Sequence, residues 1–152
     1  MSVPRTLPEQ LLRQAEHLAR VDRHKPSQAN LRRAVSASYY AVFHFLSGEC
    51  ARSLVGAKAA REPLRHLVSR SFGHSEMADA SKRFASAPQN FPEVVEAALA
   101  GLGVQSSVQQ VAESFGILQE KRHLADYDLS KSFVREEVLA IVETTRKDVL
   151  GR

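Results

Sequence analysis

The sequence predicts an all-α fold, an up-and-down bundle of four to five helices with an irregular insertion between the third and the last-but-one long helix. Two observations support this prediction. Apolar residues recur at helical spacing over several long windows, whereas strand-like alternation never lasts beyond a few residues. We expect one domain over residues 1–152, because a chain of about 150 residues can bury a core without a disulfide or a metal.

The first two helices are predicted from their caps and their apolar faces. Thr6 is expected to cap the first helix, whose apolar face comprises Leu7, Leu11, Ala15, Leu18 and Val21. Ser27 is expected to cap a long second helix ending near Ser47, because glycine, here Gly48, commonly follows a helix C-terminus. The apolar stripe of this second helix contains Leu31, Val35, Val42 and Leu46.

The second half of the chain is predicted to contain three more segments. A third helix is expected over about residues 58–70, and short helical pieces broken by proline and glycine over residues 75–103. A second long helix should extend from Ser106 to Leu129. Ser132 is expected to cap a final helix, whose apolar face comprises Val134, Val138, Ile141, Val142, Thr145 and Val149.

Composition narrows the classes of function. The net charge is +4, and residues 1–76 carry 12 basic against 6 acidic side chains, a bias that favours phosphate-bearing partners. Residues 1–10 lack the hydrophobic core that a signal peptide needs, and no apolar run is long enough to cross a membrane, so we expect a cytoplasmic protein that does not bind membranes. It also lacks a Gly-rich phosphate loop, paired CxxC motifs and HExxH, so we expect no metal and no cofactor.

A polar stripe on the second predicted helix lies opposite its apolar stripe. At 100 degrees per residue, Arg33, Tyr40 and His44 fall within about 40 degrees of one another. Such a stripe suits a cleft in which a base stacks and a phosphate is held. It equally suits packing of these side chains on the insertion or on a second copy of the chain.

Two charged residues stand in the apolar stripe of the predicted helix 106–129. Arg122 and Asp126 occupy positions where leucine or valine is usual, and their i, i+4 spacing allows an ion pair. Burying a guanidinium is costly unless it is paired. Two interpretations remain open, a structural ion pair that fixes helix register and an arginine that lines a polar cleft and holds a phosphate.

Two segments carry a resemblance to a known family. LRRAVSASYYAVFHFL, residues 31–46, and KRHLADYD, residues 121–128, resemble the HEPN superfamily, in particular its toxin and nucleotidyltransferase-associated type. The resemblance implies a helical bundle that forms a homodimer, with motif arginines facing a cleft between protomers. It also implies relatives that are metal-independent ribonucleases, several of them toxins paired with a nucleotidyltransferase-like antitoxin.

The motif departs from that of the active members, in which an arginine and a polar residue are followed by three residues and a histidine. Arg122 matches the arginine and His123 the polar position, but Tyr127 stands in place of the histidine, as in a branch with an R-x-x-A-D-Y ending. Tyrosine, with a pKa near 10, is a poor base at neutral pH. His44 is the better substitute, because His123 is offset by about 100 degrees from Arg122.

We therefore expect a dimer that binds RNA or a nucleotide between protomers and that could act as a toxin-type ribonuclease. The predicted catalytic residues are Arg122, His44 and Tyr127, and the predicted binding residues are Arg33, Tyr40, Asp126 and His123. The alternative is a catalytically inactive interaction module that partners a nucleotidyltransferase-like protein.

Overall fold

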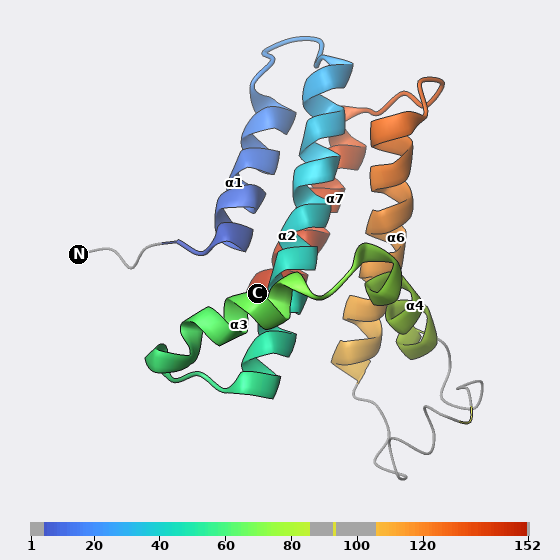
Figure 1. Ribbon diagram of the computed structural model, residues 1–152. Coiled ribbons are helices and arrows are strands. Elements are labelled where there is room, and N and C mark those ends of the chain that lie inside the picture. Colours follow the sequence, from blue (N-terminus) through green and yellow to red (C-terminus); the bar gives the residue numbers. More distant parts are fainter. Residues whose placement is uncertain (1–4, 86–92, 94–105, 152) are drawn as a thin grey trace.

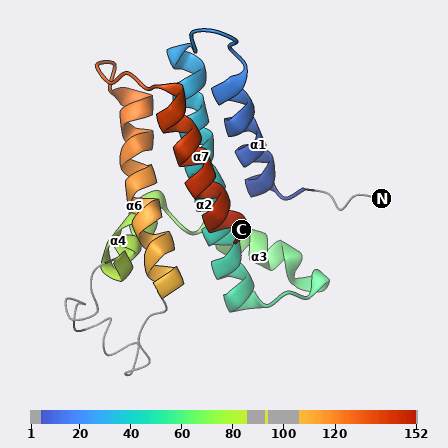
Figure 2. The same cartoon turned by 180° about the vertical axis from the view of Figure 1, so that it is seen from behind.

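The computed structural model describes residues 5–85, 93 and 106–151, and this part of the chain contains six α-helices and no strand. The predicted all-α bundle is confirmed. The long helix α2 (Gln28–Val55) is central, with α1 (Leu7–Arg20) on one side and α6 (Ser106–Tyr127) on the other (Figure 1). Seen from behind, α7 (Arg135–Leu150) covers α2 between these two helices (Figure 2).

Helix α1 begins as predicted. The Thr6 N–H donates to Glu9 Oε2 at 2.8 Å, which is one half of a capping box. The buried face is rotated slightly from the predicted one, because Leu7 and Val21 are half exposed. Ala15 is buried as predicted, and Leu11 and Leu18 pack against the core. Leu12 and Ala19 are buried beside them, and the two alanines allow α1 to lie close to α2.

Helix α2 begins at the predicted cap, where Ser27 Oγ accepts from the backbone N–H of Asn30 at 3.2 Å. The predicted end near Ser47 is wrong, since the helix continues to Val55. Gly48 lies inside it, where glycine costs only about 1 kcal/mol relative to alanine, a loss that tertiary packing can offset. The extra two turns bury Ala51 and Val55, and the helix ends at Gly56, whose φ of +91° suits glycine.

Two shorter helices follow α2. A 3-10 turn (Ala59–Arg61) leads into α3 (Glu62–Arg70), which matches the third predicted helix. In the segment where short helical pieces were expected, the structure has the short helix α4 (His74–Ala85), which packs on α6 through the buried Ala78. The rest of the predicted insertion, except residue 93, lies outside the described residues.

Helix α6 begins at the predicted residue and ends at Tyr127, two residues before the predicted end. The predicted cap of the last helix, Ser132, is wrong, because α7 follows Val134. Gln28 explains the shift. Its side-chain amide accepts from the Phe133 N–H at 2.9 Å and donates to the Phe133 carbonyl at 2.8 Å, which holds that segment extended and its ring in the core.

The core has two parts along the bundle. One, at the α1–α2 turn end, centres on Leu31, Val35 and Phe133, and the other, further along α2, centres on Tyr39, Val42 and Phe115. The second part lies beside the charged residue Arg122 of α6, whose guanidinium carbon is 5.0 Å from the centre of the Tyr39 ring. No helix in the described ranges is long and apolar enough to span a bilayer.

Candidate functional site

The predicted pairing of Arg122 with Asp126 is confirmed. Arg122 Nη1 lies 3.5 Å from Asp126 Oδ2, and the two side chains are 17% and 26% exposed. Ser36, across on α2, donates its hydroxyl to Asp126 Oδ1 at 2.7 Å. Arg122 Nε is buried and has no hydrogen-bond partner within the described residues. The guanidinium is thus largely desolvated and has one donor without a partner in the described residues, whereas Asp126 keeps contact with solvent.

A pocket of about 430 Å³ opens between α2 and α6, and it brings together four predicted site residues, Arg33, Tyr40, Asp126 and Tyr127. Arg33 is exposed and makes no hydrogen bond or ion pair to the described part of the chain. Tyr127 is 67% exposed, whereas Tyr40 is partly buried. The wall of this pocket therefore combines a free guanidinium with two phenol rings.

Arg32, the other arginine of this pocket, serves the fold. Its guanidinium donates to the carbonyl of Ala125 at 2.9 Å, to that of Leu124 at 3.2 Å and also to that of Lys131. These carbonyls belong to the C-terminal end of α6 and to the loop that follows it, where a cation complements the helix dipole. Because these carbonyls are neutral, the hydrogen bonds do not neutralise Arg32, and its positive charge contributes to the wall of the pocket.

His74, which the sequence analysis did not assign to the site, lies beside Arg122 and Tyr40. The hydroxyl of the fully buried Tyr39 is 2.7 Å from His74 Nδ1, and the His74 ring stacks on Phe43 with centroids 3.9 Å apart. Tyr39 also lies under Arg122, whose guanidinium carbon is 5.0 Å from the ring centroid. Tyr39 thus connects the imidazole of α4 with the guanidinium of α6.

The environment favours uncharged forms of both groups around Arg122. Burial lowers the pKa of His74, and the positive charge of Arg122 and the proximity of His44 lower it further. Burial raises the pKa of Tyr39, against the opposing effect of Arg122. At neutral pH, therefore, His74 is a neutral imidazole and Tyr39 a neutral phenol, and the charge of the cluster resides on Arg122 and Asp126.

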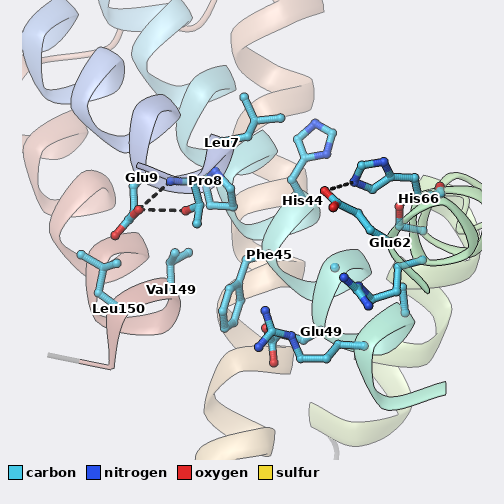
Figure 3. Close-up of a pocket in the computed structure, with 16 residues that line it drawn as sticks. Leu7, Pro8, Glu9, His44, Phe45, Glu49, Glu62, His66, Val149 and Leu150 are labelled. Atoms are coloured by element: carbon cyan, nitrogen blue, oxygen red, sulfur yellow. Dashed lines mark hydrogen bonds and ion pairs between the residues drawn. The ribbon is translucent and has the colours of Figure 1, made fainter. Parts of the chain in front are cut away.

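His44 lies apart from the pocket between α2 and α6. It lines a larger pocket of about 700 Å³ formed by the start of α1, the middle of α2, α3 and the end of α7, and Figure 3 shows it on the side of the pocket where His66 and Glu62 of α3 lie. Its ring centroid is 6.4 Å from that of Tyr40, and burial lowers its pKa. The geometry therefore leaves His44 one aromatic ring away from the pocket that contains Asp126.

His123 lies on the exposed side of α6, as its offset from Arg122 predicted. Its ring centroid is 5.1 Å from that of Tyr127, at the rim of the pocket rather than beside the guanidinium. Of the seven predicted residues, Arg122 and the four pocket residues lie together, His123 is at their edge and His44 is separate.

No signal in the sequence pointed to His74, because its contact with Tyr39 spans 35 residues between different helices. Among the described residues, no group of three His, Cys, Asp or Glu side chains could hold a metal ion. Comparison of the chain with known protein families, with curated proteins and with solved structures found no match.

Proposed function

We propose that this chain is a HEPN-like domain that binds RNA or a nucleotide in the pocket between α2 and α6. The observation that carries the proposal is the unpaired, exposed guanidinium of Arg33 in one pocket with Tyr40 and Tyr127. A guanidinium binds phosphate oxygens in a bidentate manner, and phenol rings stack on bases irrespective of sequence. This combination suits single-stranded RNA better than an uncharged ligand.

The charge balance of the pocket supports an anionic ligand. Its wall carries two arginines, Arg32 and Arg33, and one carboxylate, Asp126. That carboxylate is already paired with Arg122 and accepts a hydrogen bond from Ser36, so it repels an incoming phosphate less than a free carboxylate would. We assign Arg33 the contact with the phosphate, while Arg122, whose Nε is buried, keeps the Asp126 carboxylate paired.

The proposal includes a homodimer whose second copy completes the cleft. Beside the pocket, the loop after α6 exposes Leu129 by 92%, and Tyr127 is 67% exposed. In the proposed dimer these two side chains are covered by the second copy. Leu129→Glu is expected to shift the chain from dimer to monomer in light scattering, and a parent that is monomeric at high concentration would contradict this part of the proposal.

Binding is tested by fluorescence anisotropy with a labelled single-stranded RNA at several salt concentrations. Removing one phosphate contact by Arg33→Ala should weaken binding on the order of fivefold and reduce the log–log salt slope by about one. Arg70→Ala is the matched control, because Arg70 is an exposed arginine at the end of α3, away from the pocket. If Arg33→Ala and Arg70→Ala weaken RNA binding equally, the binding is due to general charge attraction and not to the pocket.

A second candidate is a catalytically inactive module that partners a nucleotidyltransferase-like protein. The closed arrangement of Arg122, Asp126 and Ser36 favours it, since an ion pair satisfied within the chain can serve the fold alone. Tyr127 in the motif histidine position favours it as well. If the chain binds such a purified protein, and if Arg33→Ala does not change the affinity of the chain for RNA, this second function replaces the first.

A further inference from the structure

Another pocket, of about 460 Å³, lies between α2, α4, α6 and the end of α7, and it shares no residue with the proposed RNA-binding pocket. Small side chains line it from three helices, namely Cys50 of α2, Ala80 of α4 and Ala112 of α6. Such residues leave space between packed helices that longer side chains would fill. The volume is within the range of pockets that hold small organic molecules.

The wall of this pocket is almost entirely apolar. Phe45, Met77 and Phe84 contribute two aromatic rings and a thioether, and the first two of these residues pack against the second part of the core. Among the described lining residues, Asp148 of α7 is the one that carries a charge. A single charged group in an apolar pocket is the kind of feature that fixes the orientation of a ligand.

The charge of Asp148 has no counter-ion of its own. Its Oδ2 is buried and accepts no hydrogen bond within the described residues. Burial raises the pKa of Asp148, and the group that opposes this shift is the neutral side chain of Ser114 rather than a cation. The residue lines the pocket and is half-buried, so it keeps contact with the space that a ligand would occupy. A cation in the pocket would supply the missing partner.

We propose that this pocket binds a small primary amine, whose hydrocarbon body fills the apolar space and whose ammonium group pairs with the Asp148 carboxylate. Charge complementarity favours this class of ligand. An ammonium group has three donors and needs a negative partner once it leaves water. A carboxylic acid would place two carboxylates together, and an alcohol would leave the charge of Asp148 uncompensated. The site lies outside the RNA-binding pocket, so the inference does not rest on the proposed function.

Two residues of the pocket can report its occupancy. Met77 is one of two methionines of the chain, and Cys50 is its single cysteine. Hexylamine should shift the nuclear magnetic resonance signal of the Met77 methyl group on titration, and it should slow the reaction of Cys50 with methyl methanethiolsulfonate. Hexanol and hexanoate are the comparisons of equal length. Hexanol should bind about tenfold more weakly than hexylamine, because it lacks the charge, and hexanoate more weakly still.

Three variants test the role of the carboxylate. Asp148→Asn keeps the size of the side chain and removes its charge, so it should weaken hexylamine binding about tenfold while hexanol binding changes by less than about threefold. Asp79→Asn is the matched control and should bind like the parent, because Asp79 is exposed on α4 and does not line the pocket. Ala80→Phe, at an exposed position of the wall, should fill the space and weaken both ligands.

Equal affinities of the parent for hexylamine and hexanol would overturn the inference, as would a hexylamine affinity that is unchanged in folded Asp148→Asn. So would the absence of any effect of hexylamine on the Met77 signal and on the reactivity of Cys50. If Asp148→Asn is poorly folded, the preference of the parent for hexylamine and the loss of binding in Ala80→Phe decide the matter. RNA binding is measured separately, so the failure of either proposal leaves the other in place.

Discussion

Arg122 and Tyr39 meet where α6 packs on α2, with the guanidinium carbon 5.0 Å from the centre of a fully buried phenol ring. A cation over an aromatic face is worth about 1–2 kcal/mol when it is desolvated. The same guanidinium pairs with Asp126, so a single side chain connects the aromatic core with the polar pocket. The stability of the site and its charge are therefore coupled.

The ion pair should show this coupling in a double-mutant cycle. Asp126→Ala is expected to destabilise the fold by about 3 kcal/mol, because it leaves the largely buried guanidinium unpaired. Arg122→Ala should cost less, because the Asp126 carboxylate is more exposed and still accepts from Ser36. The double variant should cost clearly less than the sum of the two. Urea unfolding of the four proteins measures the coupling, and additive effects would mean that the pair is already well solvated.

Two glycines near the end of α2 should respond to alanine in opposite directions. Gly48 is helical and has nothing within 4 Å of an added Cβ, so Gly48→Ala should stabilise by about 1 kcal/mol. Gly56 has a φ of +91°, so Gly56→Ala should destabilise by about 1 kcal/mol or more. Thermal unfolding of both variants is the measurement. Destabilisation by Gly48→Ala would place the helix end where the sequence suggested it.

Asp148 is a half-buried residue whose carboxylate weakens the fold at neutral pH, because its Oδ2 is buried. Burial raises its pKa above the ordinary 3.8, and its Oδ2 has no hydrogen-bond partner among the described residues. An acid whose pKa is higher in the folded state than in the unfolded chain lowers the free energy of unfolding once it ionises. This loss of stability therefore develops as the pH rises above 3.8, the ordinary pKa. Asp148→Leu should stabilise by about 1 kcal/mol at pH 7 and by less at pH 4, as measured by urea unfolding at both values.

His44 and His74 should make the fold sensitive to acid. Both have a pKa below the ordinary 6.5, mainly through burial, so the unfolded chain binds protons more readily than the folded one. Stability should therefore decrease as the pH falls below about 6.5 toward the folded-state values. Between pH 7 and pH 5, His74→Gln should lose less stability than the parent. An equally steep decrease in the variant would show that His74 is not desolvated in solution.

The fold was predictable because its signals are local. Ser27, Thr6 and the apolar spacing of the long helices are read within a few residues of one another, and they predicted the bundle. The errors arose where tertiary contacts outweigh local preference. Gly48 does not end α2 because Ala51 and Val55 are buried beyond it, and Ser132 does not cap α7 because Gln28 holds Phe133 extended.

The candidate site was predictable only in part, for a similar reason. Arg122 and Asp126 could be identified because charges in an apolar stripe are conspicuous, and their i, i+4 spacing defined the pair. His74 could not be identified, because its position beside Tyr39 and Arg122 depends on how α4 packs against α2 and α6. The periodicity of the sequence does not encode such packing. The position of His44 outside the α2–α6 pocket likewise depends on tertiary packing, because α3 packs beside this part of α2 and forms another pocket with it.

The location of bound RNA is the most direct test of the central claim. A single-stranded RNA containing 4-thiouridine would be photo-crosslinked to the purified protein and the modified peptides identified by mass spectrometry. The proposed function predicts crosslinks at Tyr40 and Tyr127, the two rings of the pocket between α2 and α6. Crosslinks confined to the turn between α1 and α2, which exposes Arg23 and Lys25, with none at either tyrosine, would contradict it.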